Sequence, residues 1–372
     1  MSRRLLDDEQ RRDWLRLIMS ENVGPITFRQ LINKFGSAKD ALAALPELAR
    51  RGGLQRRIRI YPADAAEKHL EAVTRHGAQL LAIGEAGYPP LLREVDTSPP
   101  LLCARGRLDV VDAPAVAIVG ARNASAIGRK FARQLAAELG AAGFAIVSGL
   151  ARGIDTAAHQ AALPTGTIAV LAGGIDNIYP PENRDLHEAI AEQGVLLAEM
   201  MPGTTPKAEH FPRRNRIISG MSYGTVVVEA ALRSGSLITA RLAGEQGREV
   251  FAVPGSPLDP RAGGTNKLLR EGATLVERAA DIIEQLRPII GRPIDEKDEF
   301  MREDQMEPEM PHDMNGHTAP QIVLALLGPA PIEIDDIVRE SGLSTATVLA
   351  SLLELELAGL ARRHRRNQVS RT

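Results

Sequence analysis

The sequence predicts an α/β protein built around a doubly wound, mostly parallel β-sheet, preceded by a helical module and followed by a winged-helix domain. Between residues 76 and 287, short runs rich in β-branched residues alternate with longer segments of helical periodicity. Several of these runs are apolar at every position, which is typical of parallel strands buried on both faces. Alternating strands and crossover helices of this kind predict a parallel sheet.

The predicted elements of this central domain follow one another in a regular order. Strands are expected at Ala115–Val119, Phe144–Val147, Thr167–Leu171, Val195–Ala198, Thr225–Val228, Glu249–Val253 and Thr274–Val276. Helices are expected to include Phe131–Leu139, Asp155–Ala162, Glu182–Glu192 and Leu237–Gln246. Such sheets bind ligands at the carboxyl ends of their strands, in the loops that lead into helices. The candidate binding residues are therefore expected in these loops.

Residues 1–75 are expected to form a helical module. Apolar residues recur at helical spacing on both sides of the turn Asn22-Val23-Gly24-Pro25, in which Pro25 suits the first position of a helix. The segment holds 15 Lys and Arg against 10 Asp and Glu. Two short helices around a glycine-containing turn resemble a small nucleic-acid-binding hairpin, and a module that serves only for packing is equally compatible with the pattern.

The C-terminal part of the chain divides into a linker, 288–317, and a compact unit, 318–372. Between residues 292 and 313 there are nine acidic and three basic residues and few apolar ones, which predicts a solvated linker. Residues 318–372 read as helix, helix, turn, helix and short strand, an order typical of winged-helix domains.

The third helix of this unit, Thr345–Leu357, occupies the position of a recognition helix. It contains Glu354 and Glu356 but no Lys or Arg, so it is not expected to read duplex DNA. Two alternatives remain for the domain: it contacts nucleic acid nonspecifically through an Arg-rich tail, or it binds another protein. The tail residues are Arg362, Arg363, Arg365, Arg366 and Arg371.

Composition excludes several classes of protein. The formal net charge of −2 gives no bulk basicity, and aromatic residues make up only 3% of the chain, so a groove dominated by stacking is not expected. The single Cys103 excludes an intrachain disulfide and a multi-thiolate metal site, and it fits a reducing compartment. We find no signal-peptide pattern and no apolar window that could cross a bilayer, so we expect a cytoplasmic protein without membrane contact.

The loop Gly120–Lys130 lies where α/β proteins bind cofactors, but it matches neither common fingerprint. Arg122 stands where a dinucleotide loop needs its second glycine, and Phe131 follows Lys130 where a Walker loop needs Ser or Thr. No cofactor is therefore expected. Arg122, Asn123 and Ser125 instead precede a helix N-terminus, which favours phosphate. A structural turn with a solvated arginine is the alternative.

A second loop, Ser148–Asp155, also follows a predicted strand. Ser148 lacks the glycine pattern of a nucleophile elbow, so we expect Ser148 and the Gly149 amide to donate hydrogen bonds to phosphate. Asp155 and His159 are spaced for a metal. Without a third ligand, a helix-capping Asp155 and a partly buried His159 are favoured.

The third loop, His210–Ser219, places three arginines in the predicted first turn of a helix, where cations oppose the helix dipole. Bound phosphates would resolve that conflict, and Phe211 offers a face for a base. Alternatively, some of these arginines pair with Glu199 or Glu229. In a fourth loop, Ser236 is expected to cap a helix and to offer its hydroxyl to phosphate.

Together, the four loops offer arginines, hydroxyls and amides, without evident paired catalytic carboxylates or a metal cluster. This set of groups suits an extended polyanion bound through its backbone, with low sequence specificity. The residues expected to bind are Arg122, Asn123, Ser148, Gly149, Phe211, Arg213, Arg214, Asn215 and Ser236.

Five ordered motifs in the central domain resemble the DNA-processing protein A (DprA, or Smf) family. They are Gly120-Ala121-Arg122, SGLARGID at 148–155, GGIDNIYPPEN at 173–183, HFPRRNRIISG at 210–220 and SGSLITA at 234–240. In the family's glycine-serine-arginine motif, Ala121 replaces the serine here, and the phenylalanine-proline-x-arginine-asparagine motif falls on residues 211–215.

The resemblance implies an extended Rossmann-like domain that binds single-stranded DNA, with a SAM-like N-terminal module and a winged helix. It further implies protection of incoming DNA, loading of RecA recombinase during natural transformation, a homodimer formed through the central domain, and no catalysis. The alternative is a related enzyme that hydrolyses nucleoside monophosphates. Gly224-Thr225…Glu229 resembles the end of that enzyme motif, but Met221-Ser222-Tyr223 stands where its preceding glycines belong. A duplex-specific regulator built on the winged helix is least compatible with the acidic helix.

Overall fold

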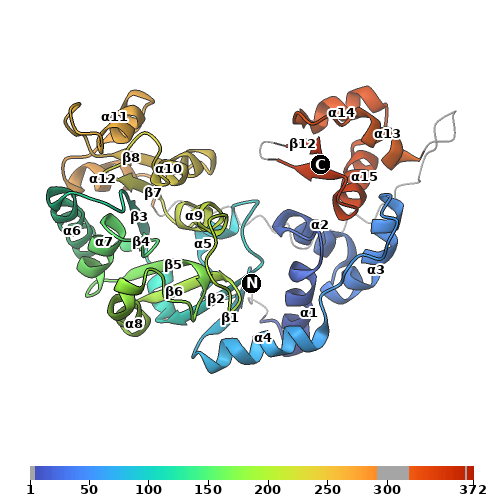
Figure 1. Ribbon diagram of the computed structural model, residues 1–372, viewed down its shortest axis with the longest axis horizontal. Coiled ribbons are helices and arrows are strands. Elements are labelled where there is room, and N and C mark those ends of the chain that lie inside the picture. The colour runs from blue at the N-terminus through green and yellow to red at the C-terminus, as the bar shows by residue number, and fades with distance from the viewer. Residues whose placement is uncertain (1–4, 291–317, 365–366) are drawn as a thin grey trace. The chain divides into compact units, whose positions relative to one another are not determined.

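The computed structural model describes residues 5–290, 318–364 and 367–372 and divides them into two compact units (Figure 1). Unit 1 contains residues 68–290. Unit 2 is formed by residues 6–67 together with the described residues from 318 to 372, so both ends of the chain contribute to it. The expected acidic linker falls almost wholly at 291–317, outside the described residues, as do Arg365 and Arg366.

Unit 1 is built on a nine-stranded sheet in the order β1-β2-β6-β5-β4-β3-β7-β8-β9. Strands β3 to β9 are parallel, and β1 and β2 extend one edge as antiparallel strands. The doubly wound, mostly parallel sheet predicted from the sequence is confirmed. The strands are β1 Gln79–Ala82, β2 Leu101–Gly106, β3 Ala115–Val119, β4 Ala145–Ser148, β5 Thr167–Gly174, β6 Val195–Met200, β7 Gly224–Val227, β8 Glu249–Ala252 and β9 Thr274–Leu275.

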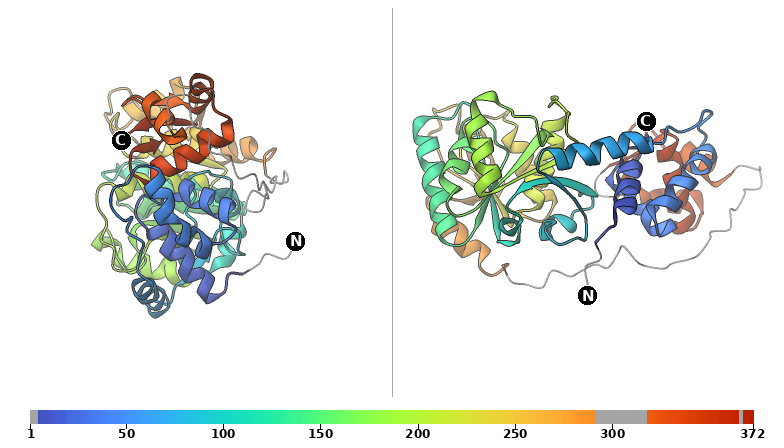
Figure 2. Two further views of the ribbon diagram at one scale, coloured as in Figure 1. Left: turned by 90° about the vertical axis from the view of Figure 1, so that its right-hand side faces the viewer. Right: turned by 90° about the horizontal axis from the view of Figure 1, so that it is seen from below.

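Helices cover both faces of this sheet (Figure 2). Helices α6, α7 and α12 pack on one face, in a core that includes Leu135, Ile154 and Ile282 against Ile118 and Val226 of the sheet. Helices α9 and α10 pack against each other on the opposite face. The helices of unit 1 are α5 Pro90–Arg93, α6 Ala126–Ala141, α7 Ile154–Ala162, α8 Arg184–Gln193, α9 His210–Gly220, α10 Ser236–Glu245, α11 Gly263–Arg270 and α12 Ala279–Leu286.

The winding direction of the sheet reverses at β3, which pairs with β4 on one side and β7 on the other. The chain runs from β3 through β4 and β5 to β6 in one direction, and later from β7 to β9 in the other. Loops that leave the sheet on either side of such a reversal diverge and open a crevice at the carboxyl edge. Here the diverging loops are those after β3 and β7, whereas the loops after β3 and β4 both lead into helices, α6 and α7, that pack together on one face.

Unit 2 combines a four-helix segment with the winged helix. Its helices are α1 Asp8–Met19, α2 Pro25–Phe35, α3 Ala38–Arg51 and the first turns of α4 Ala63–Arg75, followed after the linker by α13 Ala319–Leu326, α14 Ile334–Ser341 and α15 Thr345–Leu357. Its three short strands are β10 Ile332–Glu333, β11 Ala361–Arg363 and β12 Gln368–Arg371. These elements confirm the N-terminal helical module and the C-terminal winged helix.

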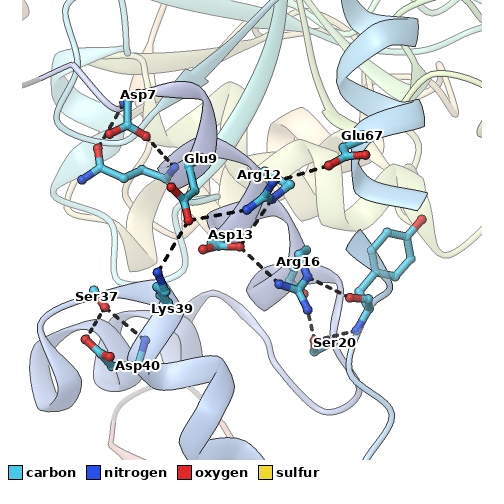
Figure 3. A network of polar contacts seen from close by, with 12 residues as sticks. Asp7, Glu9, Arg12, Asp13, Arg16, Ser20, Ser37, Lys39, Asp40 and Glu67 are labelled. Atoms are coloured by element: carbon cyan, nitrogen blue, oxygen red, sulfur yellow. Dashed lines mark hydrogen bonds and ion pairs between the residues drawn. The ribbon is translucent and has the colours of Figure 1, made fainter. Parts of the chain in front are cut away.

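A polar network ties α1 to α4 and to the segment before it (Figure 3). Arg12 lies 3.4 Å from Glu67 of α4 and 3.7 Å from Asp13, while Arg16 donates to Asp13 at 3.2 Å and to the Tyr61 carbonyl at 3.2 Å. Asp13 is 5% exposed. The pairs with Asp13 are partly withdrawn from water and are therefore stronger than exposed ion pairs, whereas the Arg12–Glu67 pair, with the Glu67 side chain 54% exposed, adds a weak link from α1 to α4.

Across the described ranges, we find no helix with both the length and the apolar character needed to cross a membrane.

Candidate nucleic-acid interface

The loops after β4, β5 and β6 and the start of α9 meet at the carboxyl edge of the sheet and enclose a pocket, and the loop after β3 reaches its rim through Arg122. Each loop lies there because it continues a parallel strand, and parallel strands end at the same edge. The pocket is lined by Gly149, Ala151, Leu171, Ala172, Gly173, Asn177, Tyr179, Pro206, Phe211 and Arg214. Two of the four predicted loops thus line it directly.

At the rim, an arginine and two aromatic rings form a stack. The guanidinium carbon of Arg122 lies 4.9 Å from the centre of the Phe211 ring, and the Tyr179 ring meets Phe211 edge-on at 5.6 Å. Arg122 and Asn123 are exposed, Phe211 is half-buried and Tyr179 is 45% exposed. The rim therefore presents a positive charge and apolar ring surface to solvent, the pair of features that single-stranded nucleic acids require.

Tyr179 and Asn177 were not selected from the sequence, although they lie within the motif at 173–183. Their position in the sequence could have identified them, because they lie in the loop after β5 just as Arg122 lies in the loop after β3. Their loop turns through a cis peptide bond between Tyr179 and Pro180.

Arg214 forms part of the pocket wall from inside the protein and is only 6% exposed. Its Nη1 donates to the Gly149 carbonyl at 2.6 Å and also to the Val170 carbonyl. Burial lowers the pKa of Arg214 to about 10, although the Asp155 carboxylate counteracts this effect. Its Nε has no hydrogen-bond partner among the described residues. Arg214 therefore ties the loop after β4 to strand β5 from inside the protein.

Arg213 and Arg216 pair with Glu199, as one alternative proposed. Arg213 donates two hydrogen bonds to the Glu199 carboxylate, at 3.0 Å and 2.7 Å, and Arg216 donates one at 2.6 Å. These pairs explain how the arginines are tolerated near the start of α9. That helix begins at His210, so Pro212 is its third residue and not its first, and Arg214 and Arg216 lie beyond the first turn. Arg213 stays about half exposed, and Asn215 is half-buried.

The expectation that Ser148 and the Gly149 amide contact phosphate requires correction. Ser148 is fully buried and its hydroxyl donates to the Ile118 carbonyl at 2.6 Å, while the Gly149 amide donates to Asp155 at 3.1 Å. A donor that is already satisfied inside the fold gains little from an external ligand. Both groups shape the loop.

The N-terminus of α6 is already occupied by a carboxylate. Glu229 accepts from the Ser125 amide at 2.9 Å and from its hydroxyl at 2.5 Å, and Ser125 caps the helix by accepting from the Gly128 amide at 2.8 Å. A Cβ atom on Gly128 would lie 2.5 Å from the Glu229 carboxyl carbon, so glycine is needed for this approach. The phosphate expected at this helix end is thus replaced by a side chain of the protein, and the exposed Arg122 and Asn123 of this loop remain available.

Ser236 also differs from expectation. Gly235 is the N-cap of α10, and Ser236 is the first helical residue, 8% exposed, with its hydroxyl 2.8 Å from that of Ser234. The Ser236 hydroxyl therefore does not cap the helix, and it is largely withdrawn from solvent.

Asp155 and His159 stabilise the loop after β4. Asp155 accepts from the Gly149 and Ala151 amides, and Gly153 takes the capping position of α7. His159 is fully buried between Thr167, at 2.7 Å, and the Leu150 amide, and burial lowers its pKa to about 3. No cluster of three or more possible metal-ligating residues occurs in the described part of the chain.

Three family models match the chain. The model for DNA recombination-mediator protein A covers residues 79–287, the DprA-like N-terminal HHH domain covers 8–72 and the DprA winged helix domain covers 308–365. Among characterised relatives, the DNA processing protein DprA of Bacillus subtilis is 45% identical over 220 residues, covering 58% of this chain and 74% of its own. Protein Smf of Synechocystis is 34% identical over 384 residues, covering 93% and 95%.

Solved structures of two DNA processing proteins are among those that resemble this fold. DprA from Streptococcus pneumoniae matches with a TM-score of 0.62 and 36% identity, over 73% of this chain and 95% of that one. DNA processing protein A from Helicobacter pylori, described in terms of its single-stranded DNA binding mode, matches with a TM-score of 0.53 and 31% identity, over 57% and 96%.

Proposed function

Because the chain belongs to the DNA-processing protein A (DprA/Smf) family, we propose that it binds single-stranded DNA at the carboxyl edge of the sheet in unit 1. The observation that most directly supports this proposal is the exposed Arg122 stacked on Phe211, beside Tyr179, at the rim of a pocket. A phosphate can pair with the guanidinium while a neighbouring base uses the ring surface.

The flanking polar groups suit a strand better than a single nucleotide. Asn123 and Arg213 lie on the same edge, on different elements, and both are exposed. Arg213 keeps part of its guanidinium in solvent while it pairs with Glu199, so it adds a weaker, partly neutralised contact. We assign Arg122, Asn123, Phe211, Tyr179 and Arg213 to the surface, and Arg214 to its support.

The biological role that fits this surface is protection of incoming single-stranded DNA and its delivery to RecA recombinase during natural transformation or recombination. We infer a non-catalytic cytoplasmic protein that dimerises through the central domain. Support for this wider role comes from family membership and from the description of the H. pylori relative as a single-stranded DNA binder.

Fluorescence anisotropy tests whether the protein prefers single-stranded DNA. The measurement compares a fluorescent oligothymidine with a labelled duplex of equal length. We expect preference for the single strand and an affinity that falls as salt rises, because phosphate contacts release counterions. Equal affinity for the duplex would contradict the proposal.

A nucleoside monophosphate hydrolase is the alternative function. Glu229, which ends the resemblance to that enzyme's motif, is held by the Ser125 amide and hydroxyl at the end of α6, where it serves as the helix-terminal anion. Incubation with nucleoside monophosphates tests this alternative, and release of free base would favour it over single-stranded DNA binding.

A further inference from the structure

Unit 2 contains two elements of kinds that commonly bind DNA. One is the hairpin formed by α1, the turn Ser20–Gly24 and α2, and the other is α15, the recognition helix of the winged helix. The two elements are more than 300 residues apart in sequence, since the hydrogen bond from Asn22 to Leu357 spans 335 positions. In the structure they contact each other directly, with α15 beside α2 and α3 (Figure 1).

The contact is apolar at its centre. Leu353 and Leu357 of α15, 4% and 0% exposed, belong to the same core as Phe28, Leu31 and Leu45 of the N-terminal helices. The opposite side of α15, with Val348, Leu352 and Leu355, fills the core of the winged helix itself. A helix that is apolar on both sides is buried on both sides, which accounts for the sequence of α15 without any DNA contact.

The polar contacts fall on the turn of the hairpin. The Asn22 side-chain amide donates to the Leu357 carbonyl at 3.0 Å, and the Thr27 hydroxyl donates to Glu356 at 3.3 Å. Glu356 also accepts from Arg363 at 2.8 Å. Thr27 lies in the first turn of α2, whose N-cap Gly24 makes no side-chain capping bond. Glu356 thus supplies a negative charge at the helix end to which a DNA phosphate would otherwise come.

A second acidic residue of α15 is also buried where the helix packs on the N-terminal helices. Glu354 is 2% exposed, one of its carboxylate oxygens has no hydrogen-bond partner in the described chain, and its backbone closely contacts Gly52 at the end of α3. Two buried acids on a recognition helix would repel a DNA phosphate backbone. Arg363 compensates the charge of Glu356, whereas burial raises the pKa of Glu354 and the charges of Arg51 and Lys34 only oppose this effect.

We propose that the winged helix is an intrachain cover for the N-terminal hairpin: α15 docks on the hairpin turn, and in this docked state neither element binds duplex DNA. Undocking exposes the hairpin turn, beside basic residues of the N-terminal segment such as Arg57 and Arg59, which are already exposed in the docked state. The docked and undocked states then differ in their affinity for duplex DNA, while single-stranded DNA binding by unit 1 is the same in both.

Gly52 offers a way to separate the two states. Its backbone is right-handed helical, with φ −69° and ψ −5°, so alanine is compatible with the conformation. A Cβ atom there would overlap the Glu354 carbonyl group, far inside van der Waals contact. Gly52→Ala should therefore wedge α15 away from α3. Gly328→Ala is the matched control, because Gly328 lies in the same unit with open space around its Cβ position.

The experiment compares the full-length protein, Gly52→Ala and Gly328→Ala by hydrogen exchange and by anisotropy with a labelled duplex of arbitrary sequence. In Gly52→Ala, we expect amides at residues 20–28 and 353–358 to lose protection together. We also expect duplex affinity to rise roughly tenfold, since apparent affinity scales with the fraction of molecules in the undocked state. Gly328→Ala should behave as wild type in both measurements.

Loss of protection without a gain in duplex binding would overturn the proposal, as would unchanged protection in Gly52→Ala. If Gly52→Ala unfolds the N-terminal helices, Thr27→Glu replaces it. Glutamate suits the first turn of α2 but faces Glu356 across a 3.3 Å contact, so repulsion separates the same surfaces from the other side. A folded Thr27→Glu protein that stays docked, or that undocks without binding duplex, would equally overturn the proposal.

Discussion

The guanidinium of Arg122 lies over the face of the Phe211 ring, 4.9 Å from its centre, although the two residues come from different loops of unit 1. The ring holds the long arginine side chain over the pocket rim and so reduces the conformational entropy that a phosphate contact would cost. This relationship links two of the five sequence motifs in one surface.

Replacing Arg122 with Ala should weaken single-stranded DNA binding by about 1–3 kcal/mol, because a charge-assisted contact is lost. Arg122→Lys should recover only part of the loss, since lysine keeps the charge without the planar fork. Oligothymidine anisotropy measures both variants. Unchanged affinity in Arg122→Ala would remove Arg122 from the surface.

Tyr179 gives a test of the ring surface. Tyr179→Leu should lower affinity for the oligonucleotide by about 1–3 kcal/mol if a base stacks there, whereas Tyr179→Phe should bind as wild type. The comparison separates the ring from the hydroxyl. Equal affinity in all three proteins would show that no base uses Tyr179.

Truncation of the neighbouring residues Arg213 and Arg214 should lower stability to different extents. Arg214→Ala leaves the Gly149 and Val170 carbonyls without their donor inside the protein, so we expect a loss of about 2–4 kcal/mol in stability. Arg213→Ala leaves Glu199 paired with Arg216 and should cost at most about 1 kcal/mol. Thermal unfolding distinguishes them, and equal shifts of Tm would contradict the assigned roles.

Burial of His159 predicts how stability depends on pH. Its pKa is lowered to about 3 in the folded protein, so the unfolded chain, with a histidine pKa of about 6.5, binds the proton first as pH falls. The free energy of unfolding should therefore fall from about pH 6.5 toward about pH 3, by at most about 1.4 kcal/mol per pH unit from this group.

The matched variant is His159→Gln, which removes the titrating ring. His69 and His187, whose pKa values are also lowered by burial, remain in it and titrate in the same direction. Tm measured at about pH 7.5 and about pH 5.5 should differ less in this variant than in wild type. An unchanged difference would mean that His159 does not contribute.

Much of the central sheet was predictable because several of its parallel strands are apolar at nearly every position and are bounded by turn residues. The strand predicted at Ala115–Val119 matches β3 residue for residue, and the other six predicted strands coincide with β4 to β9 within a few residues. The edge strands β1 and β2 were not predicted. Their antiparallel pairing depends on contacts with β6 that the local sequence does not encode.

The candidate site was predictable only in outline. Sequence position placed Arg122 and Phe211 at the carboxyl edge, but whether a polar group faces solvent or the interior depends on neighbours distant in the chain. Glu229 occupies the end of α6 from 104 residues away, and Ser148 donates to a carbonyl 30 residues earlier. The N-terminus of α6 and the Ser148 hydroxyl were both expected to contact phosphate. Hydrogen bonds within the fold satisfy these groups instead.

By itself, the sequence determined the family, the strand and helix order, and the acidic, apolar character of α15, since periodicity and motif spacing are local properties. Only the tertiary structure decided which of the neighbouring arginines is buried, which aromatic ring supports Arg122, and what α15 packs against. The physical reason is that burial and pairing depend on distances in space: Glu356 and Thr27 are 329 residues apart in the chain and 3.3 Å apart in the fold.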